Sequence, residues 1–221
     1  MPRAIIFANG LINPPYPERA DFQPDDWFIA ADGGSIHCTR LGITPHTLIG
    51  DFDSLPKAEI DKLAQQGTQI IQHASHKDET DLELALYYAI EHAARQIIVY
   101  GALGARWDMT LANLMLLTHP ALQSVQLSLI DGHQQISLLK NGQTLQILGA
   151  IGDTVSLIPL SQEARGITTH GLEYCLLNGL LTLGSPRGVS NVIVGEPCQI
   201  TLEEGALVIV HIRQVQPARK E

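Results

Sequence analysis

The sequence has little of what marks secreted, zinc-binding and membrane proteins. Its three cysteines, Cys38, Cys175 and Cys198, lie far apart and no C-x-x-C pair is present, which argues against a structural zinc site and a disulfide framework. No apolar run approaches the roughly 20 residues of a membrane-spanning helix, and the apolar stretch near the N-terminus is too short for a secretion signal. We therefore expect reduced thiols and a cytoplasmic location.

Basic residues are scarce as well. The chain has 14 Lys and Arg against 23 Asp and Glu, a net charge of -9, and no basic cluster stands out before Arg219-Lys220 at the C-terminus. Because binding to nucleic acid requires a basic face, we do not expect nucleic acid as a partner. A nucleotide fits this charge balance, since metal ions neutralise phosphate charge locally.

What the sequence does contain is an alternation of strands and helices in its first part. The predicted strands are Ala4–Ala8, Trp27–Ala31, Thr47–Ile49, Thr68–Gln72, Gln96–Tyr100 and Val125–Ile130. The predicted helices are Ser35–Leu41, Lys57–Gln66 with Pro56 at its first position, Asp81–Arg95, and Arg106–His119 with Leu111, Leu114-Met115 and Leu117 facing inward. This alternation predicts an α/β domain with a doubly wound, mostly parallel sheet, whose strand ends gather at one edge.

Beyond residue 131 the pattern changes to short strands with turn signals at a spacing of about ten residues, which predicts a sandwich or a barrel. One of these signals is Asn141-Gly142, which predicts a hairpin between the runs on either side. We therefore expect an α/β domain over residues 1–131, an all-β sandwich domain over 132–213 and a loose tail over 214–221.

Two aspartates, one residue apart, follow the third predicted strand. In extended backbone Asp51 and Asp53 point to the same side and Phe52 to the other. Their repulsion is costly unless a cation lies between them, and Mg²⁺ suits such oxygens because it fills the rest of its shell with water and substrate phosphate. By itself the pattern is more typical of a turn or a solvated loop.

A second acidic stretch runs from Lys77 to Asp81. Thr80 and Glu83 fit the N-cap and N3 positions of a capping box, which places Asp81 in the first turn of a helix, where backbone N–H groups attract anions. Asp78 and Asp81 are also what a plain helix start would contain. Because both acidic stretches lie where a doubly wound sheet binds its ligands, we expect them to meet and to hold a metal–polyphosphate.

Two loops of small residues are further candidates. Gly33 and Gly34, after Asp32, would let a ligand phosphate approach the backbone closely. The sequence there is neither a P-loop nor a dinucleotide fingerprint, and a tight strand-to-helix turn is an equal alternative. In the β part, Ser190 and Asn191 could orient a heteroaromatic ring, although the residues alone are more typical of a plain loop.

A glycine turn with a cation just past it begins at Gly101. Arg106 could form a fork onto phosphate oxygens, or it could pair with Asp108 or another surface acid. Asn113 lies two helical turns beyond Arg106 and therefore on roughly the same helix face.

Together these stretches resemble the bacterial thiamine pyrophosphokinase (thiamine diphosphokinase) family. The motifs that carry the resemblance are Ala31-Asp32-Gly33-Gly34, Gly50-Asp51-Phe52-Asp53-Ser54, Lys77-Asp78-Glu79-Thr80-Asp81, Gly101-Ala102-Leu103-Gly104-Ala105-Arg106-Trp107-Asp108 and Gly188-Val189-Ser190-Asn191. Singly they are weak, but five in this order are specific and cover nearly the whole chain. The resemblance implies an N-terminal α/β domain that binds ATP, a C-terminal sandwich that binds thiamine, and a homodimer with active sites at the subunit interface. It implies Mg²⁺-dependent transfer of the pyrophosphoryl group of ATP to the hydroxyl of thiamine, with release of AMP.

The resemblance also assigns roles to residues. The implied metal ligands are Asp51, Asp53 and Asp81, the implied nucleotide contacts are Asp32, Gly33, Gly34, Lys77, Thr80, Arg106 and Asn113, and the implied thiamine contacts are Ser190 and Asn191. Arg106 would act on the phosphates during catalysis, and Asp78 or Asp81 could accept the hydroxyl proton. The chain departs from the usual family pattern at Ala105 and Met109, where glycine and histidine are common.

Three rival functions share these features. A pyrophosphokinase for another alcohol, such as a hydroxymethylpterin, would use a similar α/β domain. A non-catalytic sensor of nucleotide or thiamine would not need so many metal ligands. A Mg²⁺-dependent phosphohydrolase would release free phosphate without an acceptor.

Overall fold

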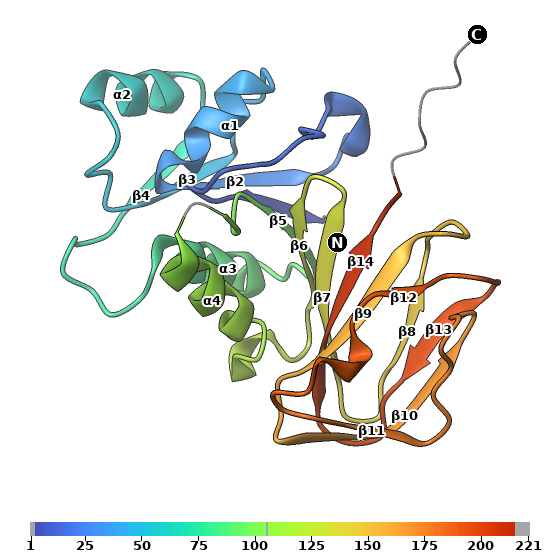
Figure 1. Ribbon diagram of the computed structural model, residues 1–221. Coiled ribbons are helices and arrows are strands. Elements are labelled where there is room, and N and C mark those ends of the chain that lie inside the picture. The colour runs from blue at the N-terminus through green and yellow to red at the C-terminus, as the bar shows by residue number, and fades with distance from the viewer. Residues whose placement is uncertain (1–2, 105, 215–221) are drawn as a thin grey trace, which may run out of the picture. The chain divides into compact units, whose positions relative to one another are not determined.

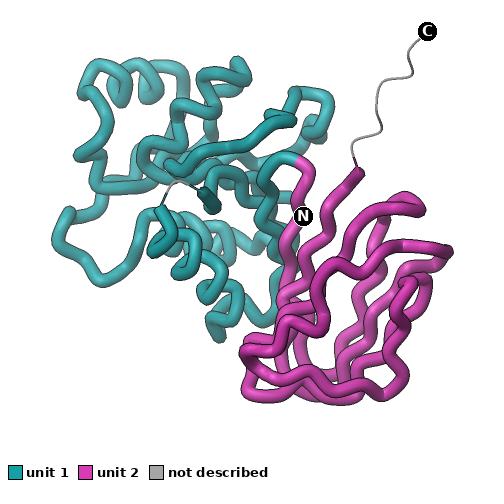
Figure 2. Tube along the Cα trace, in the orientation of Figure 1, with its two compact units in different colours: residues 1–132 teal, residues 133–221 magenta. Residues whose placement is uncertain are grey.

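The computed structural model describes residues 3–104 and 106–214 and divides into two compact units, Met1–Gly132 and His133–Glu221 (Figure 2). Ala105 and residues 215–221 of the predicted tail lie outside the described residues. None of the helices within the described ranges is long and apolar enough to cross a membrane.

Unit 1 is built on a parallel sheet whose strands run in the order β6-β5-β1-β2-β3-β4. The strands are β1 (Ala4–Phe7), β2 (Trp27–Ala31), β3 (Thr47–Gly50), β4 (Gln69–Gln72), β5 (Gln96–Tyr100) and β6 (Gln126–Asp131). The helices are α1 (Ser35–Arg40), α2 (Lys57–Gln65), α3 (Asp81–Glu91) and α4 (Trp107–Leu116), and short 3-10 turns lie at Arg19–Asp21, Asp32–Gly34 and Pro120–Leu122. Figure 1 shows α1 and α2 on one face of the sheet and α3 and α4 on the other. The predicted doubly wound, parallel fold is confirmed.

The winding of this sheet reverses at β1, which has β2 on one side and β5 on the other. The turns that follow β1 and β5 are in close contact: a Cβ atom on Gly10 would lie 2.3 Å from the carbonyl oxygen of Gly101, and one on Gly101 would lie 2.5 Å from that of Ala8. Gly101 also has a φ of +71°, which glycine adopts without strain. Ligands of doubly wound sheets bind in the crevice at such a reversal, so these glycines shape the place where a ligand is expected.

Several helix boundaries differ from the sequence prediction: α1 and α2 each end one residue earlier, and α4 spans Trp107–Leu116 instead of Arg106–His119. Helix α3 ends at Glu91 instead of Arg95, because Ala93 adopts a left-handed φ of +65° that ends the helix before β5 begins. Pro56 is the N-cap of α2 and not its first helical residue. All of these differences lie at helix ends, where competing backbone conformations differ little in free energy.

The prediction of which side of α4 points inward is wrong in part. Leu111 and Met115 are each 53% exposed, and Trp107, one turn earlier, is 81% exposed. The buried side of the helix carries Asn113, and Leu117 is buried just past the helix end. The apolar spacing identified an amphipathic helix but did not identify the side that packs on the sheet.

Unit 2 is an all-β sandwich of two antiparallel layers, as predicted. One layer has the strand order β12-β9-β14-β7 and the other β11-β10-β13-β8. The strands are β7 (Gln134–Lys140), β8 (Thr144–Ile147), β9 (Thr154–Pro159), β10 (Glu163–His170), β11 (Gly179–Thr182), β12 (Asn191–Val192), β13 (Cys198–Thr201) and β14 (Ala206–Ile212), and a 3-10 turn lies at Pro186–Gly188. Leu157 and Ile209 of the first layer share one buried core with Ile167 and Ile200 of the second, which is the packing that defines a sandwich.

The turn at Asn141-Gly142 does not close the predicted hairpin. Strand β7 before it pairs with β14, and β8 after it pairs with β13 in the other layer. The turn therefore passes between layers, held by hydrogen bonds from the N–H of Gly142 to the carbonyl oxygen of Glu203 (3.1 Å) and from the N–H of Gly205 to Oδ1 of Asn141 (2.5 Å). The Asn-Gly signal specified a tight turn with a left-handed glycine, but it carried no information about which strands pair.

A buried contact between a histidine and a carboxylate fixes the end of β14 in unit 2. His211 Nε2 lies 2.8 Å from Oδ2 of Asp153, and the N–H groups of Ala150 and Gln214 also donate to this carboxylate. Burial by itself would raise the pKa of Asp153, but the hydrogen bonds from Gln214, His211 and Ala150 lower it overall. The carboxylate is thus stabilised in its charged form in the folded protein.

We expect Asp153→Asn to lower the free energy of unfolding by about 2 kcal/mol at pH 7, because it removes a charged acceptor from buried donors. Since the folded-state pKa is lowered, this contribution is present above the ordinary Asp pKa of about 4 and is lost as the pH falls through the folded value. Urea unfolding of the variant and of wild type at pH 7 and pH 3 should show a difference that narrows in acid. An equal difference in the free energy of unfolding at pH 7 and pH 3 would contradict the conclusion that the charged form of Asp153 stabilises the fold.

Candidate active site

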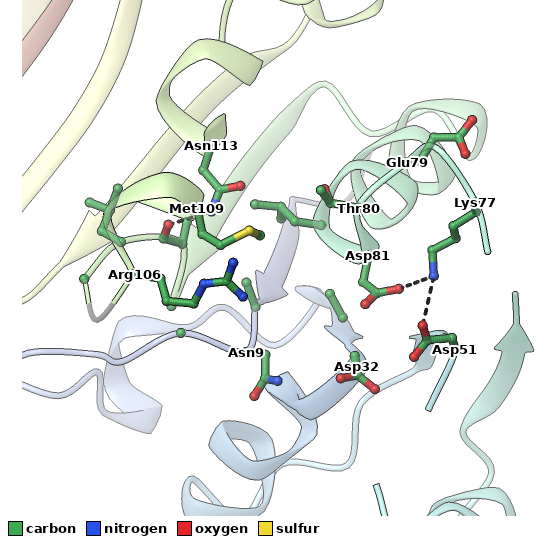
Figure 3. A pocket seen from close by; sticks show the side chains of 18 of the residues that line it. Asn9, Asp32, Asp51, Lys77, Glu79, Thr80, Asp81, Arg106, Met109 and Asn113 are labelled. Atoms are coloured by element: carbon green, nitrogen blue, oxygen red, sulfur yellow. Dashed lines mark hydrogen bonds and ion pairs between the residues drawn. The ribbon is translucent and has the colours of Figure 1, made fainter. Parts of the chain in front are cut away.

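A cavity of about 430 Å³ opens at the carboxyl edge of the parallel sheet in unit 1. Its walls come from the segments that follow β1, β2, β3 and β5 and from the first turns of α3 and α4 (Figure 3). This is the reversal point of the winding, where the carboxyl ends of β1 and β5 diverge. The topology therefore brings together side chains from five separate stretches of the sequence.

Three carboxylates gather at one side of this edge. Asp32, Asp51 and Asp53 each offer an oxygen, and these oxygens all lie within 4.8 Å of one another. Asp32 is buried, and its Oδ2 accepts a hydrogen bond from the Ser54 hydroxyl, whereas its Oδ1 has no hydrogen-bond partner among the described residues. A buried carboxylate oxygen without a donor is costly, and a cation is the kind of partner that would satisfy it.

The carboxylates of Asp51 and Asp53 are close to each other, and the pKa of each is shifted. The backbone N–H of Asp53 donates to Oδ1 of Asp51 (3.1 Å), and this hydrogen bond together with the charge of Lys77 lowers the pKa of Asp51. The negative charge of Asp51 in turn raises the pKa of Asp53, with smaller contributions from Asp32 and Asp81. The two carboxylates are close, but the predicted extended backbone is wrong, because Phe52 has a left-handed φ of +65° and a turn follows at residues 53–54.

Lys77 partly compensates this charge. Its Nζ lies 2.8 Å from Oδ1 of Asp81 and 3.7 Å from Oδ2 of Asp51 (Figure 3). Burial alone would lower the pKa of Lys77, but the hydrogen bond and charge of Asp81 and the charge of Asp51 raise it overall. The two predicted acidic stretches thus meet through one ammonium group, and Asp81 lies outside the group of three close carboxylates.

The first turn of α3 forms one wall of the cavity. Thr80 is the N-cap, and its hydroxyl oxygen accepts a hydrogen bond from the N–H of Glu83 (3.2 Å). The carboxylate of Glu83 accepts from the Tyr87 hydroxyl (2.6 Å). Thr80 and Asp81 line the cavity, whereas Asp78 is exposed and does not.

The opposite wall is formed by the turn after β5 and by α4. Arg106 lines the cavity and forms a bidentate ion pair with Asp108, with Nε–Oδ1 and Nη2–Oδ2 distances of 3.1 and 2.5 Å. This is the surface pairing that the sequence left open as an alternative. Asn113 is buried, lines the cavity, and donates from Nδ2 to the carbonyl oxygen of Ala102 (2.7 Å), which fixes the turn. Met109 also lines the cavity.

Gly33 and Gly34 are buried and do not line this cavity. A Cβ atom on Gly34 would lie 1.9 Å from the carbonyl oxygen of Phe7, and one on Gly33 would lie 2.2 Å from Oδ1 of Asn9. The glycines therefore let the turn that carries Asp32 pack directly against β1 and against the side chain of Asn9.

Asn9 was missed by sequence reasoning. Its side chain lines the cavity close to Asp32 (Figure 3). The available signal was its position as a polar residue directly past the carboxyl end of β1, next to the glycine turn at Gly10.

The predicted residues of unit 2 lie in a separate loop. Ser190 has a left-handed φ of +59°, and its N–H donates to the Ser156 hydroxyl (3.0 Å). Asn191 is buried and is bonded to the backbone of Tyr174 on both sides, accepting from its N–H (3.0 Å) and donating to its carbonyl oxygen (2.8 Å). Asn191 also lines a cavity of about 510 Å³, together with Tyr174 and Arg187.

Comparison with known proteins gives a consistent picture. Residues 21–129 match the family model described as thiamin pyrophosphokinase, catalytic domain, and residues 136–207 match the model described as thiamin pyrophosphokinase, vitamin B1 binding domain. Thiamine pyrophosphokinase of Bacillus subtilis is 29% identical over 183 residues, which cover 83% of this chain and 86% of that protein. Thiamine pyrophosphokinase 1 of Arabidopsis thaliana is 27% identical and covers 95% of this chain and 78% of that protein.

Solved structures agree with the sequence comparisons. The crystal structure of thiamine pyrophosphokinase from Bacillus subtilis superposes with a TM-score of 0.85 at 27% identity, covering 96% of this chain and all of that chain. That of thiamin pyrophosphokinase from Geobacillus thermodenitrificans gives a TM-score of 0.83 at 27% identity, covering 98% and 99%. The similarity therefore extends over both units.

Proposed function

This chain belongs to the thiamin pyrophosphokinase family, and from that premise we infer that it transfers the pyrophosphoryl group of ATP to the hydroxyl of thiamine, giving thiamine diphosphate and AMP. The observation that carries this conclusion is the cavity at the sheet edge, which combines crowded carboxylates with Lys77 and Arg106 inside the segment that matches the catalytic domain. Anion-binding and cation-binding groups in one cavity are what a metal–polyphosphate requires.

We propose that ATP binds in this cavity of unit 1. Arg106 and Lys77 supply positive charge, and the Thr80 hydroxyl lies at a helix N-terminus that favours anions. Asn113 positions the turn after β5 through its hydrogen bond to Ala102. Gly33 and Gly34 act indirectly, because they hold the turn of Asp32 against β1.

Mg²⁺ fits the carboxylates found here. Asp51 and Asp53 offer hard oxygen donors close to each other, and a cation would satisfy the buried Oδ1 of Asp32, which has no hydrogen-bond partner among the described residues. We propose Asp51, Asp53 and Asp81 as the ligands, with Asp32 adjacent. A bound divalent ion would offset the negative charge that develops on the phosphate chain.

In the proposed reaction, the hydroxyl oxygen of thiamine forms a bond to the β-phosphorus of ATP. The bond from that phosphorus to the bridging oxygen of the α-phosphate breaks, and AMP leaves with this oxygen. The proton of the hydroxyl passes to a carboxylate, for which Asp81 is better supported than Asp78 because Asp81 lines the cavity. Positioning of the two substrates and neutralisation of charge contribute most to the rate.

Thiamine is proposed to bind at the loop of Ser190 and Asn191 in unit 2. Asn191 fixes the backbone of Tyr174 beside a cavity, and the neighbouring Ser190 is exposed. Residues 132–213 would then be the thiamine-binding domain and residues 1–131 the ATP-binding domain. This assignment is supported by the description of the model that matches residues 136–207.

We further propose a cytoplasmic homodimer. Trp107, Leu111 and Met115 are exposed at four-residue spacing along one face of α4, and an exposed apolar stripe of this kind is typical of an interface. The free cysteines Cys38, Cys175 and Cys198 are compatible with a reducing compartment. Light scattering of the purified protein would measure the subunit number.

We expect Arg106→Gln to lower kcat/KM for ATP by about a hundredfold. The substitution removes a guanidinium group that can donate two charge-assisted hydrogen bonds to phosphate oxygens. The matched control is Asp108→Asn, which releases Arg106 from its ion pair and should leave the KM for ATP unchanged or lower it. Steady-state kinetics with varied ATP measures both variants. A loss in Asp108→Asn equal to that in Arg106→Gln would assign the pair a structural role instead.

The substrate is tested with a panel of alcohols, scored for AMP. The proposed function predicts AMP formation with thiamine and none above background with 6-hydroxymethylpterin. AMP formation only with the pterin would favour the alternative pyrophosphokinase, and binding of ATP and thiamine without AMP would favour a sensor. Phosphate release without any acceptor would indicate a hydrolase.

A further inference from the structure

Lys77 forms ion pairs with one carboxylate from each of the two acidic stretches. Its ammonium group lies between two carboxylates, 2.8 Å from Oδ1 of Asp81 and 3.7 Å from Oδ2 of Asp51. The Lys77 side chain is only 13% exposed, and those of Asp51 and Asp81 are 14% and 28% exposed. Solvent and salt therefore screen these two ion pairs less than they screen ion pairs between fully exposed side chains.

The ammonium group of Lys77 lies near both of the carboxylates that a divalent ion bridging Asp51 and Asp81 would use. Mg²⁺ binds carboxylate oxygens at about 2.0–2.1 Å, so an ion on these carboxylates would lie a few ångströms from the ammonium group, and the repulsion between the two positive charges disfavours binding of both. Asp81 is held by Lys77 and lies outside the group formed by Asp32, Asp51 and Asp53. Asp81 would join that group around an ion more readily if Lys77 moved away, because the charge of Lys77 repels the ion.

The side chain of Lys77 can move away from the two carboxylates and stay within the cavity. It is carried by residues 73–80, which form neither helix nor strand between β4 and α3, and its four-carbon stem is flexible. The same side chain lines the cavity that also contains Thr80 and Arg106. An ammonium group displaced from the carboxylates therefore remains next to the place proposed for the phosphates.

We propose that Lys77 is an internal counter-ion that competes with the divalent ion for Asp51 and Asp81 and is passed to the nucleotide phosphates when the ion binds. This inference rests on the proposed function, since it takes the cavity as a metal–nucleotide site. It makes binding of the ion alone weak and couples it to binding of the nucleotide, because the released ammonium group gains a new anionic partner.

The test is the affinity for Mn²⁺, measured by electron paramagnetic resonance on the full-length protein without nucleotide. Lys77→Met should bind Mn²⁺ about tenfold more tightly than wild type, because a competing positive charge a few ångströms away is removed. Lys77→Arg, which keeps the charge, should stay within about twofold of wild type by the same reasoning. Lys62→Met, an exposed lysine of α2, is the matched control and should not change the affinity.

The coupling is measured by repeating the titration with a non-hydrolysable ATP analogue. The analogue should tighten Mn²⁺ binding more in wild type than in Lys77→Met. If Lys77→Met does not fold, as judged by circular dichroism, Lys77→Gln takes its place. Mn²⁺ affinity in the uncharged variant that is equal to or weaker than wild type would overturn the proposal, as would absence of Mn²⁺ binding in both. Thiamine diphosphate formation by wild type, assayed in parallel, shows whether the proposed function fails separately.

Discussion

Asp53→Ala and Asp81→Ala are each expected to abolish formation of AMP and thiamine diphosphate, a loss of about a thousandfold or more. Asp53 belongs to the close group of carboxylates, and Asp81 lines the cavity at the first turn of α3. Neither side chain is part of the buried core, so the fold should be retained. Because the charge of Asp51 raises the pKa of Asp53, removing Asp53 relieves repulsion, and the unfolding temperature in EDTA should be unchanged or higher.

The measurement combines steady-state kinetics with thermal unfolding of the same preparations. Asp61→Ala, at an exposed position of α2 in the same unit, is the matched control and should keep both activity and unfolding temperature. Near-normal activity in both site variants would refute the metal assignment. Loss of activity together with a large fall in unfolding temperature would assign these aspartates to stability instead.

Gly34→Ala is expected to lower the free energy of unfolding by about 3 kcal/mol, at the upper end of the usual cost of overpacking. The added Cβ atom would lie 1.9 Å from the carbonyl oxygen of Phe7 and 2.6 Å from its carbonyl carbon, so β1 or the turn must move. Gly34 has an ordinary helical φ of -57°, which means that the clash alone causes the loss. The unfolding temperature should fall by about 10 °C for a chain of this size.

Gly195→Ala is the control for this substitution, because an added Cβ atom there would have no neighbour within 4 Å. Its unfolding temperature should stay close to that of wild type. A Gly34→Ala variant as stable as wild type would show that the turn carrying Asp32 can move away from β1 at low cost. The account of how Asp32 is held in place would then be wrong.

The α/β architecture could be predicted because each of its strands can be recognised from the apolar residues of its own short segment. β1 and β3 are short apolar runs buried along their whole length, and such runs alternating with amphipathic helices have few arrangements other than a parallel sheet. The carboxylate side of the site followed from this, since parallel strands end at one edge. Asp51 and the stretch around Asp81 could therefore be brought together from the sequence.

Other features depend on contacts between distant residues and could not be predicted. The turn at Asn141-Gly142 has the composition of a hairpin, but the partners of β7 and β8 are β14 and β13, far along the chain. In α4, Leu111 and Met115 satisfy the spacing of a buried face although the sheet covers the other side. The place of Asp32 beside Asp51 and Asp53 depends on how closely Gly34 packs on β1.

The central claim is that the carboxylate-lined cavity of unit 1 transfers a pyrophosphoryl group to thiamine. It is tested most directly with ATP labelled at the γ-phosphorus, incubated with thiamine and Mg²⁺ and followed by separation of all products. The account predicts that the label appears in thiamine diphosphate, in equal amount with AMP, and that both are absent with Asp53→Ala or without a divalent ion. Label in thiamine monophosphate or in free phosphate, with ADP in place of AMP, would contradict it.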